Sequence, residues 1–230
     1  MVSYFFLTLG GGLTWLLTKL FLKLKITGRE NVPSKTTGLM LVANHQSLAD
    51  SFFIITFWQP FWRSILHPKM IPWNTPEAGN FFKTPLLKFI FKHLRCLPVK
   101  RNGLMKKAEI MEFFKKIKKI LQSGNLLIFF EGTRTRSGEI GEVKSGVVKI
   151  IRDNLPTVIP IRIDGLSELM PIGAKGFKVR WLGKRVPISI TIGKPMYFAE
   201  LLKVEVENKT NAASIAKAIR EAVLELKTTG

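Results

Sequence analysis

The N-terminal stretch of the chain is almost entirely apolar. No charged residue occurs before Lys19, and three glycines at positions 10–12 interrupt the apolar run. Because consecutive glycines are costly in a helix interior, we predict two short apolar helices, over residues 2–9 and 13–25. Each is too short to cross a bilayer, which takes about 20 residues. The pattern therefore favours a helical hairpin that lies in the membrane interface over a spanning helix.

A secretory signal peptide is the competing interpretation of this stretch. Such a peptide has a positively charged segment before its apolar run and a cleavage site with small residues after it. Residues 1–25 have neither feature. We therefore expect them to form a membrane-attachment segment of the protein.

Beyond Pro33, short apolar runs alternate with longer segments of helical periodicity. The runs typical of buried strands are residues 39–42, 126–130, 157–163 and 188–192, with a further candidate at 178–182. The segments with helical spacing of apolar residues are 47–57, 81–94, 104–122, 143–153 and 212–226. This alternation predicts an α/β fold, with a mixed, largely parallel sheet covered by helices on both faces.

Composition adds constraints on partners and compartment. The 230 residues include 36 Lys and Arg against 16 Asp and Glu, a net charge of +20. This excess indicates a polyanionic partner, either nucleic acid or an anionic lipid surface, and the apolar N-terminus favours the lipid surface. The single cysteine, Cys96, cannot form an intrachain disulfide, which favours a reducing compartment. We expect one domain over residues 26–230, after the segment 1–25.

The segment from Asn44 to Asp50 is the first candidate for chemistry. His45 and Asp50 are too far around a continuous helix to meet, but they can pair if His45 precedes the helix and Asp50 lies in its first turn. The carboxylate would then accept a hydrogen bond from one nitrogen of the imidazole and leave the other nitrogen as a base. The alternative is purely structural, because the run from Ser47 to Asp50 is also a helix-capping signature.

The second candidate is the loop after the apolar run 126–130. Glu131, Gly132, Thr133 and Arg134 combine a tight turn with a hydroxyl and a guanidinium, and Arg136 follows closely. Backbone amides and arginine side chains suit a phosphate group. An ordinary polar surface loop is the alternative interpretation.

Two further segments are weak evidence for a functional site when each is taken alone. Lys100 and Arg101 follow an apolar segment at Leu97–Val99, and a basic pair is usually just solvated surface. The run 158–161 is a buried strand that contains a proline, which is ordinarily read as core or edge packing.

In this order, the four segments resemble the glycerolipid acyltransferase superfamily, specifically the bacterial 1-acyl-glycerol-3-phosphate (lysophosphatidic acid) acyltransferases. The pattern N-H-x-x-x-x-D is matched in full from Asn44 to Asp50. The pattern F-P-E-G-T-R-S is matched at residues 131–134, with Phe130 in place of the usual proline and Thr135 in place of serine. Residues 99–101 and 158–161 match the two remaining blocks, and the sequence from Lys144 to Gly146 resembles an F-K-x-G segment. The resemblance covers residues 25–195.

The resemblance implies a mechanism and a setting. His45 would be the general base, oriented by Asp50, and acyl-CoA or acyl-carrier protein would be the co-substrate. Phosphate and loop contacts would come from the basic pair and the second loop: Lys100, Arg101, Glu131, Gly132, Thr133 and Arg134. We expect no other cofactor and no metal, because none of the three histidines, His45, His67 and His93, has a partner at ligand-like spacing. Residues 26–230 would be the catalytic domain, and the protein would be peripheral or monotopic on the cytoplasmic face of the inner membrane, with anionic lipids and lysophosphatidic acid as partners.

Three alternatives remain open on the sequence. The acceptor could be another lysolipid, such as a lyso-ornithine lipid. The same His–Asp pair could hydrolyse a thioester with water in place of the lipid alcohol. The chain could also be a basic membrane-binding or nucleic-acid-binding protein without catalysis, which would explain the charge of +20 but not the four ordered segments.

Overall fold

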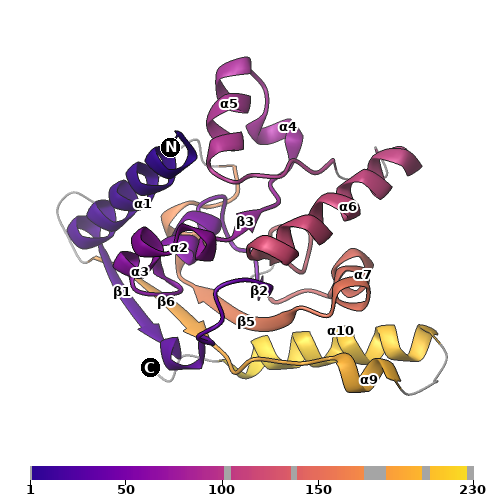
Figure 1. The fold of residues 1–230 in the computed structure, drawn as a ribbon. Helices are drawn as coiled ribbons and strands as arrows, with labels where there is room; N and C mark the ends of the chain where they lie inside the picture. The colour runs from indigo at the N-terminus through magenta and orange to yellow at the C-terminus, as the bar shows by residue number, and fades with distance from the viewer. Residues whose placement is uncertain (1, 101–104, 136–138, 174–184, 204–207, 227–230) are drawn as a thin grey trace.

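A computed structural model describes residues 2–100, 105–135, 139–173, 185–203 and 208–226 of the chain (Figure 1). The strands are β1 (Leu22–Thr27), β2 (Leu39–Ala43), β3 (Trp73–Asn74), β4 (Leu126–Phe129), β5 (Thr157–Asp164) and β6 (Val186–Ile192). The α-helices are α1 (Val2–Phe21), α2 (Asp50–Phe57), α3 (Phe61–Leu66), α4 (Ala78–Phe81), α5 (Pro85–His93), α6 (Lys107–Ser123), α7 (Ser145–Asn154), α8 (Leu166–Leu169), α9 (Ala199–Lys203) and α10 (Asn208–Glu225).

The strands form one sheet in the order β1-β6-β5-β2-β4-β3. All neighbouring pairs are parallel except β5 and β6, which are antiparallel. The predicted mixed, largely parallel sheet is therefore confirmed. β2 lies between β5 and β4, both parallel to it, so the carboxyl ends of these three strands meet at the same edge of the sheet.

Helices cover both faces of the sheet, as predicted. Along β2, alternate side chains enter two separate cores. Leu39 and Leu41 pack with side chains of α2, such as Phe53. Met40 and Val42 pack on the other face with buried residues of α6, α7 and α10. Figure 1 shows this division, with α1, α2 and α3 on one side of the strands and α7 and α10 on the other. A strand buried on both faces explains the uninterrupted apolar run that identified it in the sequence.

The prediction of a two-helix hairpin at residues 1–25 is wrong. Residues 2–21 form a single helix that runs through the three glycines. The helix packs against α2 and α5, and Gly10 faces Leu94, where an added Cβ would lie 3.6 Å from Leu94 Cδ2. Tertiary contact therefore offsets a helix penalty of about 1 kcal/mol for each glycine. By length and apolar composition the helix could cross a membrane, a test that core helices and signal sequences also pass.

The second half of the predicted hairpin is a strand. Residues 22–27 form β1, which pairs in parallel with β6. Leu22 is buried, and the lysines at positions 23 and 25 are exposed, so the alternation in this segment has the period of a strand and not of a helix. The boundary predicted at residue 25 therefore falls inside the sheet.

Other differences from the prediction are smaller. The helix predicted over 81–94 is shorter than expected: α4 ends at Phe81, and α5 begins only at Pro85, with Thr84 as its N-cap. The short strand β3 was missed, and the strand proposed at 178–182 lies outside the described residues. The helix proposed from residue 47 begins at Asp50, which leaves His45 in the preceding turn. This last difference positions the candidate site.

Candidate active site

His45 and Asp50 form a buried pair at the carboxyl end of β2. Nδ1 of His45 lies 2.9 Å from Oδ2 of Asp50. The same oxygen accepts the backbone N–H groups of Gln46 (2.6 Å) and Ser47 (2.9 Å). Asp50 is fully buried, and a carboxylate that already accepts two N–H groups holds the ring proton on Nδ1. Nε2 of His45 is then left as a basic acceptor.

The capping interpretation is also correct in part. Asp50 accepts the backbone N–H of Ser47, as the acidic member of a capping box would. Ser47 Oγ, however, accepts the N–H of Ala49 at 3.1 Å and does not cap the helix. One carboxylate therefore fixes the turn and orients the histidine.

Neighbouring strands hold the turn in place. The side chain of Asn44 donates to the carbonyl of Ile163 (2.9 Å) and accepts its N–H (2.8 Å), which ties the end of β2 to β5. The ring of Phe129, at the end of β4, stacks on His45 with centroids 4.1 Å apart and planes at 12°. The imidazole is therefore fixed on one face and at one nitrogen.

Glu131 connects this turn to the second candidate loop. One carboxylate oxygen accepts the backbone N–H of His45 at 2.8 Å, and the other accepts that of Gly141 at 3.1 Å. Burial raises the pKa of Glu131, and the two backbone hydrogen bonds oppose this shift. Gly132 follows in a left-handed conformation (φ 68°), where the side chain of Lys144 lies over it. Glu131 therefore acts on the main chain, behind the histidine.

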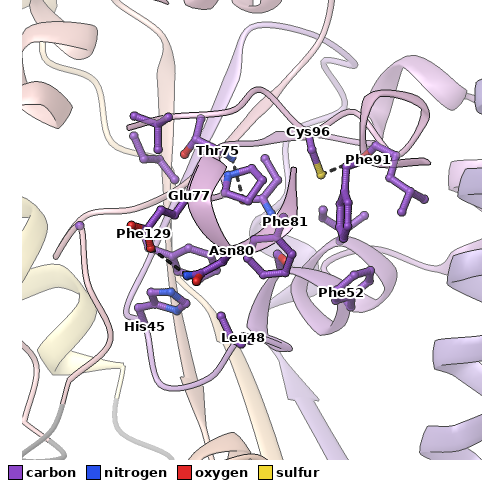
Figure 2. Close-up of a pocket in the computed structure, with 18 of the residues that line it drawn as sticks. His45, Leu48, Phe52, Thr75, Glu77, Asn80, Phe81, Phe91, Cys96 and Phe129 are labelled. Carbon is purple, nitrogen blue, oxygen red and sulfur yellow. Dashed lines mark hydrogen bonds between the residues drawn. The ribbon is translucent and has the colours of Figure 1, made fainter. Parts of the chain in front are cut away.

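A cavity of about 660 Å³ opens beside His45. Its wall includes one face of α2 and the turn before it, together with residues of α1 and α5. Figure 2 shows His45 at one end of this space, with Leu48, Phe52, Phe81 and Phe91 around it. Most of the lining is aliphatic or aromatic, which suits a hydrocarbon chain more than a polar ligand.

Cationic groups line the cavity as well. Lys100, Arg134 and Lys144 all contribute to the wall, and so do Ser145 and Gly146 at the start of α7. Lys100 Nζ lies 2.6 Å from Glu109 Oε1. This hydrogen bond is the main cause that lowers the pKa of Glu109. An anionic group beside His45 would therefore meet Arg134 and Lys144 in addition to a lysine that is already paired.

The predicted site residues fall into four groups. His45, Lys100, Gly132 and Arg134 line one cavity. Asp50 and Glu131 lie behind it as hydrogen-bond partners. Thr133 is exposed and donates to the carbonyl of Arg134, and it is not part of the cavity wall. Arg101 and Arg136 lie outside the described residues.

Sequence reasoning missed several residues of the wall. Asn80 donates from its side chain to Glu77 Oε2 at 2.8 Å, and Figure 2 shows this pair beside His45. No pattern in the sequence indicated either residue. Lys144 and Phe129 were visible in the sequence, as part of the F-K-x-G resemblance and as the end of an apolar run, but neither was assigned to the site.

The chain is similar to known acyltransferases in sequence. A family model described as Acyltransferase matches residues 23–164. A chloroplastic 1-acyl-sn-glycerol-3-phosphate acyltransferase of Brassica napus is 29% identical over 192 residues, 82% of this chain and 50% of that protein. A probable 1-acyl-sn-glycerol-3-phosphate acyltransferase of Mycoplasma pneumoniae is 32% identical over 154 residues, 65% of this chain and 54% of that protein. The chain thus spans about half the length of these relatives.

A solved structure shares the fold. The crystal structure of the 1-acyl-sn-glycerophosphate (LPA) acyltransferase from Thermotoga maritima aligns with a TM-score of 0.66 and 21% sequence identity. The alignment covers 97% of this chain and 79% of that one. The family match includes β2, the His45–Asp50 turn, the Glu131 loop and β5. The chain belongs to the acyltransferase family.

Proposed function

We propose that the protein transfers an acyl group from a thioester, acyl-CoA or acyl-carrier protein, to the free hydroxyl of 1-acyl-glycerol-3-phosphate, giving phosphatidic acid. The observation that carries this proposal is the buried His45–Asp50 pair at the end of an apolar cavity with cations in its wall. The relatives in Brassica napus and Mycoplasma pneumoniae, a 1-acyl-sn-glycerol-3-phosphate acyltransferase and a probable one, are consistent with it. The apolar wall suits the acyl chain, and the cations suit the phosphate.

The proposed reaction is a direct transfer. Nε2 of His45 takes the proton of the acceptor hydroxyl as its oxygen attacks the thioester carbonyl. The tetrahedral intermediate collapses with loss of the thiolate, which takes the proton from the imidazolium. Asp50 stabilises the imidazolium while it exists. Burial raises the pKa of the Cys96 thiol in the cavity wall to about 12, so this side chain is unsuited to a covalent step.

Arg134 and Lys100 are the described candidates for holding the acceptor phosphate, together with Arg101 from the resemblance. Lys144 joins them, because it lines the same cavity and its side chain lies over Gly132. A guanidinium can bind a phosphate with two hydrogen bonds, whereas an ammonium acts as a point charge. Arg134 is therefore the residue that we expect to orient the phosphate.

The acceptor and the product reside in a bilayer, and we propose that α1 attaches the protein to it. Large apolar side chains are exposed along this helix: Val2, Tyr4, Phe5, Leu9, Leu13, Trp15, Leu16, Leu17 and Leu20. Together with the net charge of +20, they supply the two signals that stable peripheral attachment needs. The face of the membrane that we propose is the cytoplasmic one, since acyl thioesters would be supplied there.

The test is acyl transfer by His45→Ala, with His67→Ala as the matched control, because His67 is an exposed histidine outside the cavity wall. Purified proteins receive labelled acyl-CoA or acyl-carrier protein and a panel of lysolipids that includes lyso-ornithine lipid. We expect transfer to 1-acyl-glycerol-3-phosphate to fall by about 10²- to 10⁴-fold in His45→Ala and to persist in the control. Undiminished transfer by His45→Ala would refute the mechanism. Preferred transfer to another lysolipid would show that this lysolipid, and not 1-acyl-glycerol-3-phosphate, is the acceptor.

A further inference from the structure

The apolar cavity contains hydroxyl groups that the proposed reaction does not use. Ser51, Thr56 and Ser64 all line it, with relative exposures of 8%, 4% and 3%. They come from α2 and α3, on the wall that the hydrocarbon chain would touch. Burying a hydroxyl against a plain hydrocarbon chain is unfavourable unless its hydrogen bonds are made.

The hydrogen bonding of Ser64 leaves its proton available. Gln59 Nε2 donates to Ser64 Oγ at 2.8 Å, and Gln59 is itself almost fully buried. Because Oγ accepts this bond, the hydroxyl proton of Ser64 must find an acceptor elsewhere. Among the described residues, Ser64 makes no other side-chain hydrogen bond.

Thr56 is in a similar position. Helical threonines commonly donate to the carbonyl four residues earlier, as Thr14 and Thr18 do in α1 at 2.9 and 2.7 Å. Thr56 has no such bond within the described part of the chain. Its hydroxyl therefore lies at the cavity wall without a fixed acceptor.

The position of these hydroxyls along the cavity follows from α2. Leu48, Ser51, Phe52, Ile55 and Thr56 recur at helical spacing and line one continuous wall that starts beside His45. Thr56 lies about 7.5 Å farther along the helix axis than Ser51, at about 1.5 Å for each residue. An acyl chain whose thioester lies at His45 would therefore reach Thr56 with its middle section.

We propose that the cavity selects an acyl chain that carries a hydroxyl group in its middle section, which Thr56 and Ser64 bind as hydrogen-bond donors. Gln59 acts as a positioning residue, because it fixes Ser64. This inference rests on the proposed acyl transfer and adds the chemical class of the acyl chain. The oxygen of the chain's hydroxyl group would accept hydrogen bonds from Thr56 and Ser64. A saturated chain would leave both hydroxyl protons without an acceptor.

The experiment compares octadecanoyl-CoA with hydroxyoctadecanoyl-CoA isomers that carry the hydroxyl near the thioester, in the middle, or near the methyl end. Each is given to the full-length protein with 1-acyl-glycerol-3-phosphate in detergent. We expect kcat/KM for the mid-chain isomer to exceed that for octadecanoyl-CoA by about three- to tenfold, the range for one net hydrogen bond. In Thr56→Val with Ser64→Ala this ratio falls to about one, whereas the exposed control Ser123→Ala keeps it.

Equal rates for all donors would overturn the inference and leave the proposed function intact, and so would a preference that survives the double variant. Absence of transfer from every donor would refute the proposed function instead. In that case, competition between octadecanoic acid and its mid-chain hydroxy isomer for binding to the protein still decides the inference. Tighter binding of the hydroxy isomer to wild type but not to the double variant would support it, and equal binding would overturn it.

Discussion

The end of the sheet that carries His45 and the N-terminal helix are held mainly by different forces. At the end of β2, Asp50 Oδ2 accepts three N–H groups and Glu131 accepts two, and both carboxylates are buried. In α1, only Leu7 and Thr18 are buried, and the side chains rest on α2 and α5 mainly through apolar and aromatic contacts, with one side-chain hydrogen bond to α5. Hydrogen bonds are directional, whereas apolar contacts are not.

Because of this difference, we expect the two regions to differ in how well they tolerate amino-acid substitutions. A proton transfer depends on atoms held within a few tenths of an ångström, so a substitution that leaves the shape of the His45–Asp50 turn nearly unchanged can still remove activity. Attachment to a bilayer depends on the summed apolar area, so single changes in α1 should have graded effects. Three predictions test this comparison.

The largest effect is expected from Asp50→Asn. The side chain keeps its shape, but it loses the charge that fixes the ring proton on Nδ1 and stabilises the imidazolium. We expect kcat for acyl transfer to fall by about 10²- to 10⁴-fold. Asp153→Asn is the matched control, because Asp153 forms an exposed ion pair with Lys149 on α7, away from the cavity wall. Comparable losses in the two variants would show that the buried pair has no special role.

An intermediate effect is expected from Leu13→Ser with Leu20→Ser on the exposed face of α1, where the two side chains are 56% and 54% exposed. Each replacement removes part of the about 1.5–3 kcal/mol that burial of a leucine provides. Binding to anionic vesicles, measured by flotation, should weaken by about ten- to a hundredfold. Transfer to a detergent-solubilised acceptor should persist. Tyr197→Ser, at an exposed position beyond β6, is the control, and an equal loss there would mean that attachment does not depend on α1.

The smallest effect is expected from Glu131→Gln on the pH dependence of stability. Burial raises the pKa of Glu131 above its ordinary value of 4.5, so the folded protein binds this proton more tightly than the unfolded chain does. The resulting stabilisation is fully present below pH 4.5 and is lost as the pH rises through the folded pKa. Glutamine does not titrate, so it removes this pH dependence. It also lowers the stability by the same amount at every pH, because it cannot accept both backbone N–H groups.

The measurement is Tm of the wild type and Glu131→Gln between about pH 4 and pH 7. We expect the variant to lose less stability than the wild type as the pH rises, with a change in the Tm difference on the order of a few degrees. Parallel curves would contradict the raised pKa of Glu131. Because this carboxylate holds the main chain of His45, the same variant should also lower activity, but by less than Asp50→Asn.

The sequence predicted the central part of the fold well. The runs that became β2, β4 and β5 contain continuous apolar stretches, and the run that became β6 alternates isoleucine with a polar residue; both are strong local patterns. The helices α6, α7 and α10 were found within a few residues of their ends, because each has an apolar stripe. The His45–Asp50 pairing could be predicted as well, since two residues five apart at a strand-to-helix turn have few ways to meet.

Other features depend on partners that are distant in the sequence. The prediction for residues 10–12 weighed the local cost of glycine and could not include the contact with Leu94, which directly follows α5. β1 alternates like a strand, but its assignment depends on pairing with β6. Each residue of β1 pairs with the residue 164 positions later in the chain. The two-residue strand β3 is too short to have a period, and its pairing with β4 alone defines it.

The site shows the same division. The residue types and their order along the chain indicated the family, the base that we propose and its carboxylate partner, because these lie in short continuous segments. Only the tertiary structure assigned Glu131 to the main chain of His45, 86 residues away, placed Thr133 off the cavity wall, and brought Glu77, Asn80 and Lys144 onto it. The physical reason is that a hydrogen bond or a cavity wall joins segments by distance in space, and local sequence patterns record only neighbours along the chain.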